Sequence, residues 1–149
     1  MSGDEPTEQH NLLVLDGAFE PDQVEVNVAG GSAVACTCKD PRKETENEDT
    51  VAIIPYGLGA AVLVIADGAG GLPAGKRASL TAVTTLAASL QAAMDKTMLL
   101  RTAILNGIEA ANEAVLGLAN GSATTMTVIT IEGLVARSYQ IGDSEALVV

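Results

Sequence analysis

Aromatic residues are scarce in this chain, and tryptophan is absent. Only 2% of the residues are aromatic whereas 48% are hydrophobic, so the core must consist of Val, Leu, Ile and Ala. Histidine occurs once, at His10, and both cysteines lie in the motif Cys36-Thr37-Cys38, which is too few ligands for a zinc site. A disulfide between residues two apart on one strand would be strained, so we expect both thiols to be reduced.

Basic residues are also few: eight Lys and Arg stand against nineteen Asp and Glu, for a formal net charge of −11. This balance argues against nucleic acid as a partner, because such binding depends on cationic side chains that neutralise phosphates. It also argues against an anionic membrane surface, and it fits a protein that binds cations. No apolar run approaches the ~20 residues of a membrane-spanning helix, and residues 1–9 are polar and acidic, unlike a signal peptide. We therefore predict a cytoplasmic protein.

A length of 149 residues fits one domain with a sizeable core. We predict a disordered leader over residues 1–10 and a domain over residues 11–149. Apolar periodicity predicts strands at 11–18, 24–28, 33–38, 50–56, 60–66, 124–131 and 134–141, another from 145, and helices at 75–94 and 96–118. Strands, then two long helices, then more strands indicate an α+β fold with mostly antiparallel hairpins.

The most informative segment is the apolar run 60–66, which ends in Asp67 and a glycine-rich stretch through Gly71. Seven consecutive apolar residues are typical of a buried strand. A carboxylate at the end of such a strand is costly unless a positive group pairs with it. A metal ion is the usual solution, so Asp67 is the first candidate metal ligand.

Three acidic motifs lie at predicted strand ends or turns, and each of them alone is typical of an ordinary solvated turn. They are Asn47-Glu48-Asp49, Asp67-Gly68 and Gly142-Asp143-Ser144, and the segment 121–125 opens a strand between the last two. In this order and at this spacing, over roughly residues 34–149, the sequence resembles the protein phosphatase 2C family of metal-dependent serine/threonine phosphatases.

The resemblance implies a β-sandwich flanked by helices on both sides (α/β/β/α), with two Mg²⁺ or Mn²⁺ ions per complete site. It implies that Asp67 bridges both ions as the main catalytic group and that the Gly68 carbonyl binds one of them. Glu48 and Asp49 would hold that ion directly or through water, and Asp143 would lie further out or join a weaker third site. Hard cations prefer oxygen ligands, and a metal pair activates water, here to hydrolyse phosphoserine or phosphothreonine in a phosphoprotein substrate.

Two departures from the family pattern affect this prediction. The family places an arginine, a bidentate phosphate donor, about three residues before its Asn-Glu-Asp motif, but this chain has Glu44 there. Arg42, or Lys43 beside it, is the candidate replacement. The family's remaining metal ligands come from the C-terminal half of its domain, so residues up to Val149 supply one ion site and not the full pair.

We therefore predict the N-terminal part of a phosphatase domain, incomplete at its C-terminus and weakly active or inactive by itself. Its open sheet favours self-association or a complementing chain. One alternative is a non-catalytic interaction or regulatory module of the same fold. A further alternative is a P-loop nucleotide-binding protein, because residues 70–77 match Gly-x4-Gly-Lys after a buried strand. Arg77 replaces the magnesium-binding Ser or Thr of that motif, and Asp67 would repel phosphate, so the phosphatase is preferred.

Overall fold

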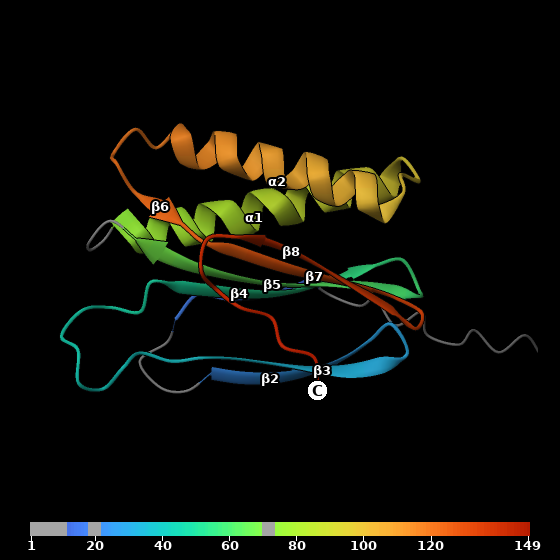
Figure 1. Cartoon of the computed structure of the whole chain (residues 1–149), viewed down its shortest axis with the longest axis horizontal. Coiled ribbons are helices and arrows are strands. Elements are labelled where there is room, and N and C mark those ends of the chain that lie inside the picture. Colours follow the sequence, from blue (N-terminus) through green and yellow to red (C-terminus); the bar gives the residue numbers. More distant parts are fainter. Residues whose placement is uncertain (1–11, 18–21, 70–73) are drawn as a thin grey trace, which may run out of the picture.

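The computed structural model describes residues 12–17, 22–69 and 74–149, and it has an α+β fold. The strands are β1 (Leu13–Leu15), β2 (Asp22–Val28), β3 (Gly31–Thr37), β4 (Asp49–Tyr56), β5 (Ala60–Ala69), β6 (Ala123–Thr124), β7 (Met126–Glu132) and β8 (Val135–Ile141), and the helices are α1 (Ala74–Asp95) and α2 (Leu100–Leu116). A six-stranded sheet has the order β1-β4-β5-β7-β8, with β6 paired to the end of β5. The two-stranded sheet β2-β3 lies against one face of it, and both helices lie on the other (Figure 1).

Alternation along the central strands divides the core between the two faces of the large sheet. The helix face carries Val62, Val64 and Val128, which pack with α1 and α2. The sandwich face carries Ile53 and Ala61, which pack against β1, β2 and β3. Two consecutive residues of β4 or β5 therefore point into different layers, and this alternation later decides where each acidic side chain lies.

The helix layer is assembled from small residues, as the composition predicts. A Cβ atom added to Gly107 of α2 would lie 2.5 Å from Leu86 Cδ1 of α1, so the two helices approach closely here and a larger residue would displace the Leu86 side chain. Ala78 and Ala82 of α1 are completely or almost completely buried. Among the residues described, neither helix combines the length and apolar character that crossing a membrane requires.

Some predicted elements differ from those of the structure. The second helix begins at Leu100, not at residue 96, because Thr97 has a φ of 52° and interrupts the helical path. Residues 145–149 form no strand; Leu147 and Val148 are about nine-tenths exposed and pair with no strand among the described residues. Within those residues both helices lie on the same face, so three of the four predicted layers are present. The predicted leader, residues 1–10, lies outside the described residues.

Candidate metal centre

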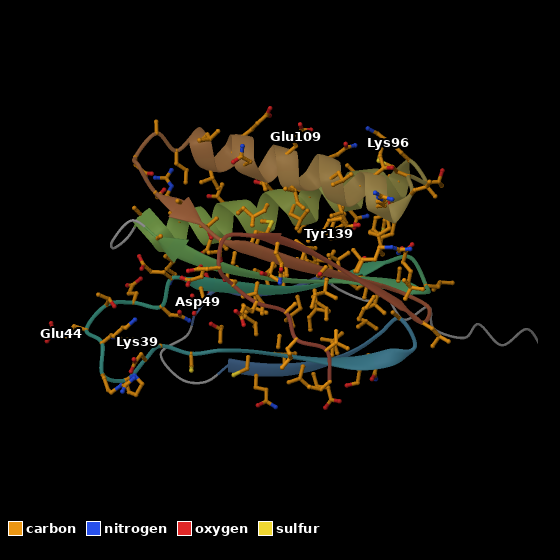
Figure 2. All side chains as sticks on the ribbon, viewed as in Figure 1. Lys39, Glu44, Asp49, Lys96, Glu109 and Tyr139 are labelled. Carbon is orange, nitrogen blue, oxygen red and sulfur yellow. The ribbon has the colours of Figure 1, made fainter. Side chains whose placement is uncertain are left out.

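Asp49 and Asp67 face each other across the β4-β5 pair. They are register partners in this antiparallel ladder, followed by the pair Thr50 and Ala66. Directly opposed residues share a face, and Thr50 and Ala66 are fully buried under the helices. The two aspartates therefore lie on the sandwich face, at the end of the sheet where β4 begins. Figure 2 shows Asp49 there, beside the loop that carries Lys39 and Glu44.

The strand that carries Asp67 is longer than predicted. β5 continues through Gly68 to Ala69, because these two residues pair with Thr124 and Ala123 of β6. Asp67 thus lies within a strand instead of opening a turn. The glycine-rich stretch that we predicted to follow it falls partly on residues 70–73, outside the described residues.

Glu48 takes the opposite direction from Asp49, towards the first turn of α1. Its backbone carbonyl accepts a hydrogen bond from the Gly68 N–H at 3.2 Å. A Cβ atom added to Gly75 would lie 2.5 Å from Glu48 Oε1 and 2.9 Å from the Gly68 carbonyl oxygen. A carboxylate oxygen and a carbonyl oxygen therefore converge on one glycine, where any larger residue would occupy their place.

Glu48 Oε1 is buried and has no hydrogen-bond partner within the part of the chain that the structure describes. A buried acceptor without a partner is costly, and more so when it carries charge. A hard cation is a partner that suits both this oxygen and the neighbouring Gly68 carbonyl. The donor chemistry at this point therefore fits Mg²⁺ or Mn²⁺.

The motif Gly142-Asp143-Ser144 reaches the same end of the sheet through Thr125. The Asp67 N–H donates to Thr125 Oγ1 at 3.0 Å, and the Thr125 N–H donates to the Asp67 carbonyl at 2.9 Å. Thr125 Oγ1 also lies 2.7 Å from Ser144 Oγ, and Gly142, at a φ of 92°, packs against the Thr125 side chain. Asp143 is exposed; its neighbours, and not its carboxylate, make these contacts.

The like charges at this end of the sheet raise the pKa of Asp49. Partial burial has the largest effect, followed by the charge of Asp67 and a hydrogen bond between the two carboxyl groups. The charge of Glu48 adds to the rise, and the positive charge of Lys43 opposes it. In a metal-free chain, two facing carboxylates favour sharing a proton because they cannot both ionise freely. A bound cation would supply the missing positive charge.

The two cationic candidates for phosphate contact differ in their surroundings. Arg42 donates through Nε and Nη2 to the Asp40 carboxylate, both at 3.1 Å, and its side chain is 88% exposed. Lys43 contributes positive charge at Asp49. Of the two, Lys43 is therefore the residue whose charge reaches the acidic pair, while Arg42 is engaged within its own loop.

The predicted site residues are brought to one end of the sheet but are not gathered into one side-chain cluster. Within residues 12–17, 22–69 and 74–149 there is no group of three or more His, Cys, Asp or Glu side chains that could hold a metal ion. Asp49 and Asp67 form a pair on the sandwich face, while Glu48 joins the Gly68 carbonyl beside α1. Backbone pairing thus positions the candidate ligands in two adjacent groups.

Sequence reasoning gave no role to Ser79, whose hydroxyl donates a hydrogen bond to the backbone carbonyl of Glu48. Its hydroxyl lies 2.5 Å from the Glu48 carbonyl and 2.9 Å from Thr50 Oγ1, and it is completely buried. The sequence gives no sign of this role, because it depends on contacts with Glu48 and Thr50, which are distant from Ser79 along the chain. A Ser-to-Ala change here leaves buried polar groups without a partner.

We expect Ser79→Ala to lower the free energy of unfolding by about 1–3 kcal/mol, the cost of unsatisfied buried polar groups. Urea denaturation monitored by circular dichroism measures this difference. Thr84→Ala is the matched control, because the Thr84 hydroxyl bonds to the Leu80 carbonyl on the exposed side of the same helix. Equal stabilities for the two variants would contradict the proposed support of Glu48.

The raised pKa of Asp49 predicts how the metal-free chain responds to pH. In the unfolded chain this carboxyl titrates near 3.8, whereas the folded chain keeps the proton to higher pH. The folded state therefore binds more protons in that window, and stability falls as pH rises from 3.8 through the raised pKa. We expect Asp49→Asn to melt at a higher temperature than the wild type at neutral pH in EDTA, with the difference vanishing below 3.8. A lower melting temperature at neutral pH would refute the like-charge interpretation.

The P-loop alternative does not agree with the surroundings of residues 70–77. Lys76 Nζ lies 3.6 Å from the Glu46 carboxylate, and the helix begins against the carboxylate of Glu48. Two acidic side chains thus lie at the start of α1, where they would repel a nucleotide phosphate. Residues 70–73 themselves lie outside the described residues.

Comparison with known proteins bears on the family and the fold of the chain. The sequence pattern of the family Protein phosphatase 2C matches residues 40–149. The fold is similar to the solved structure of the S. agalactiae serine/threonine phosphatase, with a TM-score of 0.58 and 21% sequence identity. The likeness covers 89% of this chain and 49% of that one, so this chain spans about half the length of the solved relative. No curated protein matches the chain. Because the family pattern extends over most of its length, the chain belongs to the protein phosphatase 2C family.

Proposed function

We propose that this chain forms part of a metal-dependent serine/threonine phosphatase centre that binds Mg²⁺ or Mn²⁺. The observation that carries the proposal is the buried Glu48 Oε1, which has no partner among the described residues and lies beside the Gly68 carbonyl. Membership in the protein phosphatase 2C family supports the reaction class. A phosphoprotein is the corresponding substrate.

The carboxylates have distinct tasks in this proposal. Glu48 and the Gly68 carbonyl supply oxygen ligands beside α1, and Asp67 supplies them on the sandwich face with Asp49 next to it. When bound, the metal supplies an activated water and offsets negative charge on the phosphoryl group. Asp143 is exposed, and in this proposal it adds negative charge at the periphery of the centre.

The chain's own residues also orient the centre and meet the phosphate. Thr125 fixes the backbone of Asp67 through two hydrogen bonds, so the carboxylate leaves the strand in one direction. Lys43 supplies positive charge at this end of the sheet, which favours the approach of a phosphate group. Arg42 takes part only if it exchanges the Asp40 carboxylate for the substrate phosphate.

Isothermal titration calorimetry with Mn²⁺ tests the metal centre directly. We expect one site per chain, together with weak or absent hydrolysis of a phosphothreonine peptide. The reason is that the chain spans about half of the solved relative, and that the described residues gather no cluster of three metal-binding side chains. The proposal would be overturned if no Mn²⁺ binding were detected up to the concentrations at which Mn²⁺ acts only as a general electrolyte.

The second candidate function is a non-catalytic interaction module of the same fold. The absence of a three-ligand cluster among the described residues favours it. The two functions differ in turnover and in the need for metal: hydrolysis of the phosphopeptide that depends on Mn²⁺, even if slow, indicates the phosphatase centre. Binding of the phosphopeptide that does not require Mn²⁺, without any hydrolysis, indicates a binding module.

The proposal also includes self-association through the exposed side of the sheet. Among the described strands, β8 lies at the edge of the large sheet, and Val135 and Ile141 on it are nearly half exposed. Between β3 and the sandwich face lies a groove of about 450 Å³, lined largely by aliphatic side chains. We expect light scattering to give the mass of a dimer at micromolar chain concentration. If the chain is strictly monomeric, a different, complementing chain is the partner that remains.

The cytoplasmic location stays a prediction.

A further inference from the structure

Cys36 and Cys38 form an exposed thiol pair on the outer side of the β2-β3 sheet. Along β3 the side chains of Ala35 and Thr37 point inward and are 4% and 5% exposed, while Cys36 and Cys38 are exposed and free. At the rise of a strand, Cα atoms two residues apart are separated by about 6.6 Å. Disulfides span Cα separations up to about 6.8 Å. The pair can therefore close only at the limit of this range, with a distortion of the strand at Thr37.

Thr37, the residue between the two thiols, is connected to the acidic site. Its Oγ1 accepts a hydrogen bond of 2.7 Å from Asn47 Nδ2. Asn47 Oδ1 in turn accepts a hydrogen bond of 3.2 Å from the Asp49 N–H. Asn47 is also packed tightly against Gly17, where an added Cβ atom would lie 2.9 Å from Asn47 Cβ. Two hydrogen bonds through Asn47 therefore connect Thr37 to the backbone N–H of Asp49.

We propose that Cys36 and Cys38 are a peroxide-sensitive modification site that weakens metal binding at Asp49 and Asp67. One thiolate attacks the peroxide O–O bond, forming a sulfenic acid and releasing hydroxide. The second thiol then displaces the sulfenic oxygen as water, so two thiols and one hydrogen peroxide give one disulfide and two waters. Closing this ring bends β3 at Thr37 and breaks its hydrogen bond to Asn47. A dithiol reductant reverses the reaction readily, because strained disulfides are easily reduced.

The chemical step is tested by treating the full chain with hydrogen peroxide and measuring its intact mass. We expect a monomer lighter by two hydrogen atoms, restored by dithiothreitol. Cys36→Ser and Cys38→Ser should not form this product. If wild type gives only oxygen adducts or disulfide-linked dimers, the pair does not act as proposed.

The structural step is tested by hydrogen exchange of the Asp49 amide, which does not depend on any metal. Oxidation of the wild type should increase its exchange rate, and Thr37→Val in the reduced state should do the same because it removes the acceptor of Asn47. Peroxide treatment of Cys36→Ser should leave the exchange rate of the Asp49 amide unchanged. An unchanged Asp49 exchange rate in the oxidised wild type would overturn the coupling.

The functional step rests on the proposed function, because it assumes that the reduced chain binds Mn²⁺. Loss of a group that positions a ligand lowers metal affinity by about tenfold or more, so we expect a loss of that size on oxidation and its recovery with dithiothreitol. If the reduced chain binds no Mn²⁺, the proposed function fails while the exchange experiment still decides the thiol coupling. If Mn²⁺ affinity is equal in both redox states, the proposed regulation is wrong.

Discussion

Gly68→Ala is expected to lower the free energy of unfolding by about 3 kcal/mol or more, a large effect for one methyl group. The added Cβ atom would lie 2.1 Å from the Gly75 carbonyl oxygen and 2.9 Å from the Glu48 carbonyl oxygen. Both obstacles are backbone atoms, which cannot move aside as a flexible side chain can. The junction between β5 and α1 must therefore open, and the hydrogen bond from the Gly68 N–H to Glu48 weakens with it.

Gly59→Ala is the matched control for this change. Gly59 lies in the turn between β4 and β5, where an added Cβ atom meets nothing within 4 Å. We expect its stability to stay within about 0.5 kcal/mol of the wild type. Urea denaturation of both variants gives the comparison, and equal stability of Gly68→Ala and Gly59→Ala would contradict the close approach of β5 and α1.

Asp67→Asn is expected to reduce Mn²⁺ affinity by roughly a hundredfold, the upper end of the loss seen when a residue that orients a metal ligand is changed, because in the proposed centre Asp67 is itself a charged ligand. The backbone of residue 67 keeps its hydrogen bonds to Thr125, so the fold should persist. Without metal, the variant should be at least as stable as the wild type, since the repulsion of Asp49 disappears. Calorimetric titration with Mn²⁺ and a thermal melt in EDTA measure the two effects.

The control for Asp67→Asn is Asp95→Asn, which removes the same charge at the exposed end of α1. We expect its Mn²⁺ affinity to equal that of the wild type. Equal losses in both variants would indicate that net charge attracts the metal and that no specific site exists. Retained affinity in Asp67→Asn would place the metal elsewhere.

The order of elements and the α+β fold could be predicted from periodicity, because apolar spacing follows directly from burial on one or two faces. Local breaks were harder. Thr97 interrupts the helix through a left-handed backbone conformation, which cannot be predicted from the residue type because threonine seldom adopts it. Residues 145–149 are apolar enough for a strand, but a strand also needs a paired neighbour, which composition does not reveal.

The candidate site was predictable only as a set of residue types. Motif order pointed to Glu48, Asp49 and Asp67, and alternation along β4 explains why the first two diverge. The approach of Glu48 Oε1 and the Gly68 carbonyl to Gly75 depends on contacts between distant segments, and so does the hydrogen bond between Thr125 and Ser144. The orientation of Arg42 depends on Asp40, a local partner that sequence reasoning did not weigh.

The register of the β4-β5 hairpin links correct folding to metal affinity. Asp49 opposes Asp67 and Thr50 opposes Ala66 in this register; a slip by one residue would turn Asp49 towards the helices and Thr50 towards the second sheet. A slipped hairpin would therefore lose both the facing carboxylates and the Thr50 bond to Ser79. A ligand that binds only one conformer stabilises it by mass action. A divalent cation would thus stabilise the correctly paired hairpin alone and raise its population over every misregistered competitor.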